Sequence, residues 1–261
     1  MAANPQPSHN AASDAAADAS PPAGDLSRAG ESALVRVEHL TKDYRSNRAL
    51  TDLSLTLPAG SIVALVGNNG AGKTTLLKIL AGLVADYTGR VTIADHPVGP
   101  ESKALVSFLP DRNFLDTSLT ATKAIDLYSR FFTDFDATKA REMVRFFKLP
   151  DDRPLKAMSK GTGEKLRVAL VMSRKARVYL LDEPISGVDP AARDVILNGV
   201  LSDFDPGALM IISTHLIAEV ETTVDSVIFL RDGRVLLSGN ADDLREQHAS
   251  SLDALFRKEY R

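Results

Sequence analysis

The chain has 261 residues, 44% of them hydrophobic and 25% charged, a composition typical of a globular protein with a substantial buried core. It contains no cysteine, which excludes disulfides, thiolate metal sites and cysteine nucleophiles. The net charge of −3 argues against a nucleic-acid partner, because nucleic-acid-binding domains usually carry a basic patch, and no apolar run approaches the roughly 18 residues that cross a bilayer.

Residues 1–32 are predicted to form a disordered tail. They are rich in alanine, serine and proline and contain few large apolar side chains, so burial cannot offset the entropy lost on ordering. The segment also lacks the basic and apolar regions of a secretory signal peptide, and none is expected.

Five candidate strands follow. Alternating hydrophobic and polar residues predict strands at 34–40 and 53–57. A continuous apolar run at 62–66 predicts a buried strand, and shorter candidates lie at 91–93 and 105–109. The run at 62–66 leads directly into a glycine-rich segment.

That segment is a complete G-x-x-x-x-G-K-T phosphate loop, and a helical pattern comes next. The loop consists of Gly67, Asn68, Asn69, Gly70, Ala71, Gly72, Lys73, Thr74 and Thr75. Its glycines let backbone N–H groups wrap around phosphate oxygens, and the positive end of the helix dipole points at the same place. Lys73 is predicted to reach the β- and γ-phosphates, and Thr74 to offer its hydroxyl to Mg²⁺. The chain is therefore predicted to bind a nucleoside triphosphate.

The next segment is helical. Periodicity at 121–132, at 137–147 and, after a glycine-bearing break, at 164–172 predicts three successive helices. Because they stand between strands, they indicate an inserted helical subdomain at about 112–172.

The last part of the chain returns to strands. Near-continuous apolar runs at 178–181 and 209–213 predict strands of a parallel sheet that is buried on both faces. The runs 227–230 and 234–237, joined through Asp-Gly, predict a closing hairpin. Residues 241–261 are predicted to form one or two short amphipathic helices, and packing onto the domain is preferred over a partner-binding role.

Two carboxylates, Asp182 and Glu183, follow the strand at 178–181. Phosphoryl transfer needs an acidic group near Mg²⁺ and another group that orients or deprotonates the attacking water. Neighbouring side chains at a strand end project on different sides. Asp182 is therefore assigned to magnesium and Glu183 to the water, as general base. The alternative is a pair of surface acids, which the phosphate loop upstream disfavours.

The order of these motifs resembles that of ATP-binding cassette (ABC) ATPases. These proteins carry a signature, usually Leu-Ser-Gly-Gly-Gln, shortly before the acidic strand, and the matching segment here is Met-Ser-Lys-Gly-Thr at 158–162. Ser159 and Gly161 match, whereas Lys160 and Thr162 depart. In the family this surface grips the γ-phosphate bound to the opposite subunit. Lys160 either adds a positive charge near that phosphate or extends into solvent.

Further matches fall in register over residues 34–238. The segment 186–189 stands at the place of the D-loop, which lines the dimer seam in the family. His215 matches a histidine that contacts the γ-phosphate, and Tyr44 matches an aromatic residue that stacks on adenine. Asp111 replaces the usual glutamine that touches Mg²⁺ and water. A carboxylate can still accept from metal-bound water; the alternative is a turn or capping aspartate.

The resemblance implies an α/β fold: a P-loop NTPase (RecA-like) core with a mostly parallel sheet, an antiparallel β subdomain and an inserted α-helical subdomain. It implies an ATPase domain at 33–240 and a C-terminal helical extension at 241–261. The implied catalytic residues are Glu183, His215 and Lys73. The implied magnesium ligands are Thr74, Asp182 and Asp111. The implied nucleotide-binding residues are Tyr44, Gly67, Asn68, Asn69, Gly70, Ala71, Gly72, Lys73, Thr74, Thr75, Ser159 and Gly161.

The function implied by the resemblance is that of an ATP-binding and ATP-hydrolysing subunit of an ABC transporter, with ATP and Mg²⁺ as cofactors. Such a subunit dimerises with a second ABC subunit, identical or homologous, and drives a separate membrane permease. It is cytoplasmic and peripheral on the inner face of the cell membrane. Export by a compact bacterial-type system is preferred. The alternative is a non-transport ABC ATPase that acts as an ATP-driven clamp in cofactor assembly or repair.

Overall fold

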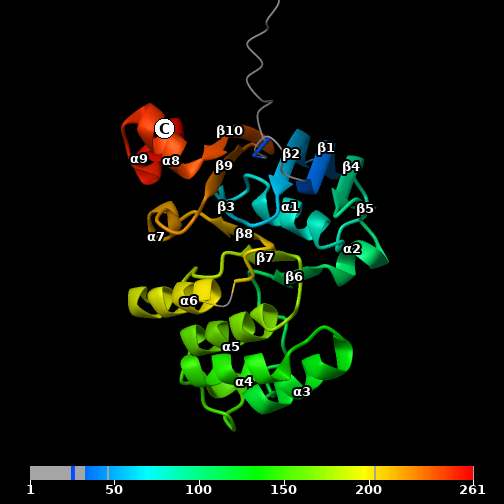
Figure 1. Ribbon diagram of the computed structural model, residues 1–261, viewed down its shortest axis with the longest axis vertical. Helices are drawn as coiled ribbons and strands as arrows, with labels where there is room; N and C mark the ends of the chain where they lie inside the picture. The colour runs from blue at the N-terminus through cyan, green and yellow to red at the C-terminus, as the bar shows by residue number, and fades with distance from the viewer. Residues whose placement is uncertain (1–24, 27–32, 46, 203, 261) are drawn as a thin grey trace, which may run out of the picture.

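The computed structural model describes residues 25–26, 33–45, 47–202 and 204–260 (Figure 1). The tail predicted for residues 1–32 lies outside these ranges except for Asp25 and Leu26. Both residues lie against strand β2, where the N–H of Leu26 donates to the carbonyl oxygen of Thr56 at 2.9 Å.

The strands of the described residues form two sheets. The first is antiparallel and has four strands in the order β2-β1-β4-β5. Its members are β1 (Ala33–Tyr44), β2 (Asn47–Pro58), β4 (Thr88–Ile93) and β5 (His96–Pro97). The predicted strands at 34–40, 53–57 and 91–93 lie within β1, β2 and β4. The two-residue β5 escaped prediction because so short a segment carries no periodicity.

The second sheet is mostly parallel, with six strands in the described residues in the order β10-β9-β3-β8-β7-β6. Its members are β3 (Ser61–Val66), β6 (Val106–Leu109), β7 (Val178–Asp182), β8 (Leu209–Thr214), β9 (Ser226–Arg231) and β10 (Arg234–Asn240). Strands β9 and β10 form the predicted antiparallel hairpin.

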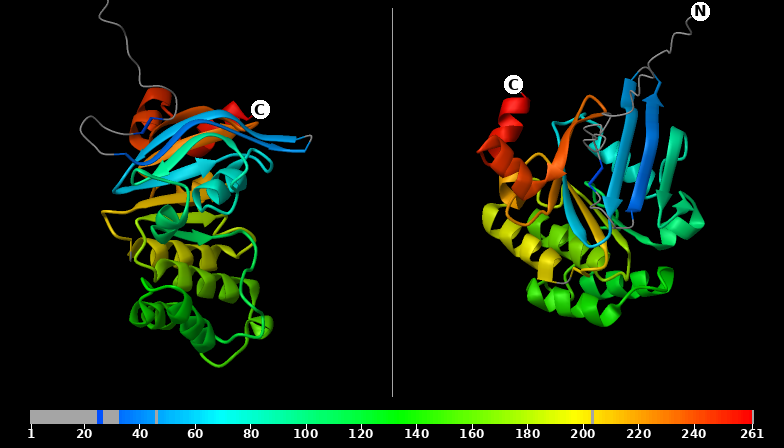
Figure 2. Two further views of the ribbon diagram at one scale, coloured as in Figure 1. Left: turned by 90° about the vertical axis from the view of Figure 1, so that its right-hand side faces the viewer. Right: turned by 45° about the horizontal axis from the view of Figure 1, so that its top comes forward.

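Helices cover the mostly parallel sheet and extend one end of the molecule. Helices α3 and α4 lie at the end opposite the antiparallel sheet, and α5 and α6 lie between them and the mostly parallel sheet (Figures 1 and 2). The helices are α1 (Lys73–Leu80), α2 (Pro100–Ala104), α3 (Ala121–Phe131), α4 (Ala137–Phe146), α5 (Lys160–Met172), α6 (Pro190–Ser202), α7 (Ile217–Val220), α8 (Ala241–His248) and α9 (Leu252–Glu259).

The predicted start of the third inserted helix is wrong. Helix α5 begins at Lys160 rather than at residue 164, so the glycines that were expected to break the helix lie inside its first turns. Ser159 caps this helix, because its side-chain oxygen accepts from the N–H of Thr162 at 3.2 Å. The cap stabilises the first turn despite the low helix propensity of glycine.

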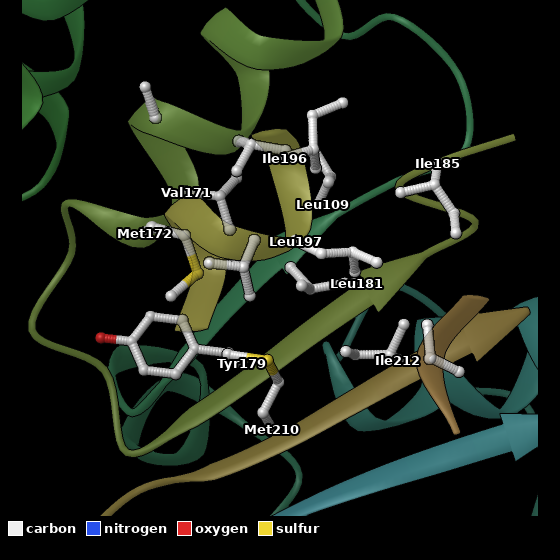
Figure 3. Packing of buried hydrophobic residues seen from close by; sticks show 14 of the residues in the cluster. Leu109, Val171, Met172, Tyr179, Leu181, Ile185, Ile196, Leu197, Met210 and Ile212 are labelled. Carbon is white, nitrogen blue, oxygen red and sulfur yellow. The ribbon is translucent and has the colours of Figure 1, made fainter. Parts of the chain in front are cut away.

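Two hydrophobic clusters of described residues lie on the two faces of the mostly parallel sheet. Along β7 the side chains alternate: Tyr179 and Leu181 join the cluster under α5 and α6, whereas Leu180 joins the cluster that includes α1 and the antiparallel sheet. Figure 3 shows the first cluster, where Val171 of α5 and Ile196 of α6 lie over the strands. Burial on both faces explains the continuous apolar runs of the sequence.

The register of the sheet decides what stands at its carboxyl edge. Val66 at the end of β3 lies beside Thr214 of β8, and Asp182 at the end of β7 lies beside Ser213. The phosphate loop therefore begins at the same edge as the two acidic residues that follow β7. Ligands of open α/β sheets bind at this edge.

Candidate functional site

The phosphate loop joins β3 to α1. Gly70 and Gly72 have φ angles of 87° and 106°, in the left-handed region that favours glycine, and Gly72 is the N-terminal cap of α1. The Lys73 side chain is 6% exposed and folds back over the loop, where its Nζ donates to the carbonyl oxygen of Gly67 at 2.6 Å. The loop thus presents glycine-rich backbone, a helix N-terminus and a buried ammonium group at one place.

The β9–β10 hairpin backs this loop. The N–H of Gly233, in the hairpin turn, donates to the carbonyl oxygen of Ala71 at 3.1 Å. A Cβ added to Gly67 would overlap the carbonyl oxygen of Leu230 at the end of β9. The loop is held from behind by backbone atoms, which leaves its other side for a ligand.

Asp182 is 1% exposed at the end of β7. Its Oδ1 accepts from Thr74 Oγ1 at 3.1 Å and from Ser213 Oγ at 2.6 Å. Its Oδ2 is buried and has no hydrogen-bond partner among the described residues. Burial raises the pKa of Asp182, and the negative charges of Asp111 and Glu183 act in the same direction. The arrangement favours a cation beside Oδ2.

Glu183 connects the other predicted catalytic residues. Its Oε2 lies 2.9 Å from Nδ1 of His215, and its Oε1 lies 3.4 Å from Nζ of Lys73. The backbone of Glu183 has a φ of 53°, and its N–H donates to the carbonyl oxygen of Ser213 at 3.1 Å. The structure therefore brings Lys73, Glu183 and His215 together from three separate segments of the chain.

A cavity of about 270 Å³ lies in front of the phosphate loop. Asp111, Glu183 and Tyr44 line it together with loop residues 68–75. Tyr44 is 43% exposed, and Nζ of Lys42 lies 4.6 Å from the centroid of its ring. An exposed aromatic face in the same cavity as a phosphate loop suits the stacking of a planar base.

The signature residues line other surfaces. Ser159 lines a separate cavity with Met158, Thr162 and Lys165. Gly161 lies against the segment after β7, where an added Cβ would stand 3.3 Å from Cγ1 of Val188. Within one chain, the structure does not bring Ser159 or Gly161 into the cavity that Lys73 lines.

Lys160 lies on the exposed side of α5. Its Nζ packs over Gly187, so that an added Cβ on Gly187 would overlap it. The departure from the family signature at Lys160 thus places a positive charge on the segment that matches the D-loop. Neither of the two sequence-based alternatives, the phosphate or free solvent, describes this contact in the single chain.

Sequence reasoning missed two residues that hold the predicted site in place. Ser213 donates to Asp182 and lies beside it in the sheet register. Arg167 of α5 donates through Nη1 to the carbonyl oxygen of Pro110 at 3.2 Å, directly before Asp111, and forms a buried ion pair with Glu164. Ser213 could have been identified from the sequence because it is the polar residue that ends the apolar run at 209–213.

Within the described ranges, none of the helices is long and apolar enough to span a membrane.

Comparison with known proteins identifies the family. A model of the family described as ABC transporter matches residues 50–186, just over half of the chain. Two relatives from Bacillus subtilis are the SkfA peptide export ATP-binding protein SkfE, 31% identical over 220 residues, and the ABC-type transporter ATP-binding protein EcsA, 30% identical over 236 residues. The matches cover 82% of this chain and 92% of SkfE, and 85% of this chain and 95% of EcsA.

Solved structures agree. One described as the ATP-binding subunit of an ABC transporter has a TM-score of 0.78 at 29% identity and covers 87% of this chain and 100% of that chain. An ATP-binding cassette in its ADP conformation has the same fold, with a TM-score of 0.71 at 21% identity. The match covers 88% of this chain and 98% of that cassette.

The predicted fold and ATPase function are confirmed by these matches, which favour a transporter subunit over a non-transport clamp. The domain limits 33–240, 112–172 and 241–261 and the roles of individual site residues stay predictions. The chain belongs to the ABC transporter family, as an ATP-binding and ATP-hydrolysing subunit that energises transport.

Proposed function

We propose that this subunit holds ATP and Mg²⁺ at the carboxyl edge of β3, β7 and β8, closes over them with a second cassette, and drives a separate membrane permease in the direction of export. The observation that carries the proposal is the meeting of Lys73, Glu183 and His215 in front of the phosphate loop, while Ser159 lies in a separate cavity of the same chain.

In this proposal four side chains at the site have separate tasks. Lys73 moves from the Gly67 carbonyl oxygen to the terminal phosphates of ATP. Glu183 orients the attacking water and accepts its proton, and His215 holds the Glu183 carboxylate while facing the γ-phosphate. Tyr44 stacks on the adenine.

Magnesium binding is supported by the unpartnered Oδ2 of Asp182. Thr74 and Asp182 would hold the ion, and Asp111 would reach it through water. The described residues contain no group of three or more His, Cys, Asp or Glu side chains suited to a metal. An ion held by one or two protein oxygens would take its other ligands from phosphates and water. When bound, it neutralises charge that develops on the phosphates.

Replacing Asp182 with asparagine is expected to remove most of the increase in ADP affinity that Mg²⁺ produces. The amide oxygen can still accept from Thr74 and Ser213, but the negative charge is lost. An interaction with a charged group contributes roughly 1.5–3 kcal/mol, which corresponds to about tenfold to a hundredfold in affinity. Calorimetric titration with ADP, in the presence and absence of Mg²⁺, measures this increase.

The same change at Asp111 serves as the comparison. Because Asp111 is exposed and is assigned only a water-mediated contact, Asp111→Asn is expected to lose less of the Mg²⁺ effect than Asp182→Asn. An equal or larger loss for Asp111→Asn would contradict the assignment of Asp182 as the main ligand.

A second cassette is proposed because the signature residues do not line the nucleotide cavity of their own chain. The start of α5 offers a positive helix end and the Ser159 hydroxyl, which pairs with Thr162 in the single chain, and both suit a phosphate. A solved cassette of the same fold, 21% identical, is a dimer in a post-hydrolysis state with ADP and Pi bound. Each Ser159 surface would meet the phosphate loop of the partner, so that closure depends on the γ-phosphate.

The permease is proposed to dock at the cleft between α1, β6 and the helical insert, next to residues 111–118. This cavity of about 210 Å³ is lined by Leu83, Phe108, Tyr128 and Phe132 among others. Leu83 is 64% exposed, and the exposed Phe114 ring lies 6.4 Å from that of Tyr128. Exposed apolar side chains around a cleft suit a short amphipathic segment of a partner. The names of the relatives support a transporter partner, and that of SkfE supports export.

Replacing Leu83 with serine is expected to reduce co-purification with a polytopic membrane protein while basal ATPase activity stays unchanged, because Leu83 does not line the nucleotide cavity. Phe131→Ser is the matched control: Phe131 is 73% exposed but does not line the cleft. Affinity purification from detergent-solubilised membranes measures the partner. Recovery of a complex that is unaffected by removing the membranes would refute the permease proposal.

A further inference from the structure

The C-terminal helices pack against the strand that backs the phosphate loop. In Figures 1 and 2, α8 and α9 lie beside β9 and β10. The ring of Phe229 in β9 lies 5.7 Å from that of Phe256 and 6.3 Å from that of Tyr260, and the last two rings are 4.3 Å apart. Leu252 and Leu255 of α9 are buried in the same cluster. These contacts fix α9 on the sheet and explain its apolar side.

One contact in this cluster is a hydrogen bond rather than apolar packing. The Tyr260 hydroxyl donates to the carbonyl oxygen of Leu230 at 2.7 Å and lies 3.4 Å from the carbonyl oxygen of Val66. Val66 is the last residue of β3, directly before the phosphate loop. The Leu230 carbonyl oxygen is also the atom that any side chain on Gly67 would strike. Tyr260 thus donates a hydrogen bond to the backbone group of β9 against which Gly67, the first residue of the loop, packs.

A second contact joins α9 to Arg231, the last residue of β9. Nη1 of Arg231 donates to the carbonyl oxygen of Glu259 at 2.7 Å. Two residues further on, the N–H of Gly233 donates to the carbonyl oxygen of Ala71 within the phosphate loop. The end of α9 and its C-terminal cap Tyr260 therefore hold the hairpin at two points, Leu230 and Arg231, and the hairpin in turn holds the loop.

We propose that Tyr260 is a positioning residue for nucleotide binding, and that α9 sets the position of the phosphate loop through the end of β9. The hydroxyl fixes the Leu230 carbonyl, and the carbonyl fixes how closely Gly67 approaches β9. The inference goes beyond the ATPase function of the family, and it depends on neither the magnesium ligands, the second cassette nor the permease.

The hydroxyl can act only as a donor to these carbonyl oxygens. Burial raises the pKa of Tyr260, so the phenol stays protonated at every pH at which the protein would be assayed. A phenylalanine at this position would keep the ring contacts with Phe229 and Phe256 and lose the hydrogen bond alone. This separates positioning of the loop from packing of the helix.

Tyr179→Phe provides a matched control. Its hydroxyl donates to the carbonyl oxygen of Arg174 at 2.6 Å and is buried, but it belongs to the start of β7, at the opposite end of that strand from Asp182. The two substitutions therefore remove the same group from the same kind of bond at different places. Both are expected to lower the free energy of unfolding, and only Tyr260→Phe is expected to alter nucleotide affinity.

The test is fluorescence titration of the full chain with a mant-labelled ADP in excess EDTA. Tyr260→Phe is expected to weaken binding about threefold to tenfold, the loss of one net hydrogen bond, and Tyr179→Phe to stay within about twofold of the unmodified chain. Arg231→Met, which breaks the second link from the hairpin side, is expected to shift affinity in the same direction.

An unchanged affinity in Tyr260→Phe, with unfolding free energy lowered as in Tyr179→Phe, would show a purely structural role and overturn the proposal. An equal loss of affinity in both tyrosine variants would also overturn it. Binding by the unmodified chain tests the family function separately, because the proposal concerns only the ratio between variant and unmodified protein.

Discussion

Replacing Glu183 with glutamine is expected to lower the steady-state ATPase rate by about two to four orders of magnitude, the range for loss of a general base. The amide has nearly the same shape as the carboxylate that lies between His215 and Lys73, so the cavity keeps its form. An amide cannot accept the proton of the attacking water. ATP binding should remain, since the phosphate loop is intact.

This substitution should also trap a dimer. If closure of two cassettes requires the γ-phosphate, a variant that binds ATP without cleaving it accumulates the closed form. Phosphate release measures the rate, and light scattering with ATP against ADP measures the dimer. Glu101→Gln, at an exposed carboxylate paired with His96, is the control for a change of charge. ATPase activity that is unchanged in Glu183→Gln would refute the assignment of the general base.

Replacing Gly67 with alanine is expected to abolish nucleotide binding and to lower the free energy of unfolding by about 1–3 kcal/mol, the usual cost of overpacking. The added Cβ would overlap the Leu230 carbonyl oxygen and stand 2.9 Å from Cβ of Ala71. Both obstacles are part of the loop or of the sheet behind it. The methyl group fits only if the loop moves off β9, which displaces the N–H groups that would face the phosphates.

Gly163→Ala is the matched control for this change. Gly163 lies in α5, and an added Cβ there meets nothing within 4 Å. Alanine at an open helical position is expected to raise the free energy of unfolding by about 0.5–1 kcal/mol. Denaturant unfolding and ADP titration of both variants measure the difference. A Gly67→Ala protein that binds ADP like the unmodified chain would contradict the close contact with Leu230.

The convergence of Lys73, Glu183 and His215 could be predicted because their motifs are local and the strands before them are parallel. Lys73 lies in a contiguous loop after β3, and Glu183 and His215 each follow an apolar run. Parallel strands of one sheet end at one edge. The three motifs meet there because β3, β8 and β7 are neighbours in the sheet. The same apolar runs predict that β7 and β8 are buried on both faces, as the structure has them.

Other parts of the site depend on contacts that no local pattern carries. Ser213 supports Asp182 only because β7 and β8 pair in one particular register. Arg167 reaches the Pro110 carbonyl oxygen across 57 residues of sequence. The early start of α5 could not be predicted because glycine has a low helix propensity. In the structure, Gly161 packs closely on Val188, and a larger side chain at this position would crowd Val188. In each case tertiary structure overrides the local tendency.

The left-handed backbone of Glu183 sets stability against function at one residue. A φ of 53° at a residue other than glycine costs roughly 1 kcal/mol or more, and the hydrogen bonds from its N–H to Ser213 hold it there. Glycine at this position would avoid that cost, but it would also remove the carboxylate. Stability and turnover therefore make opposite demands on this position, since the residue proposed as general base is also one that holds the backbone in a strained conformation.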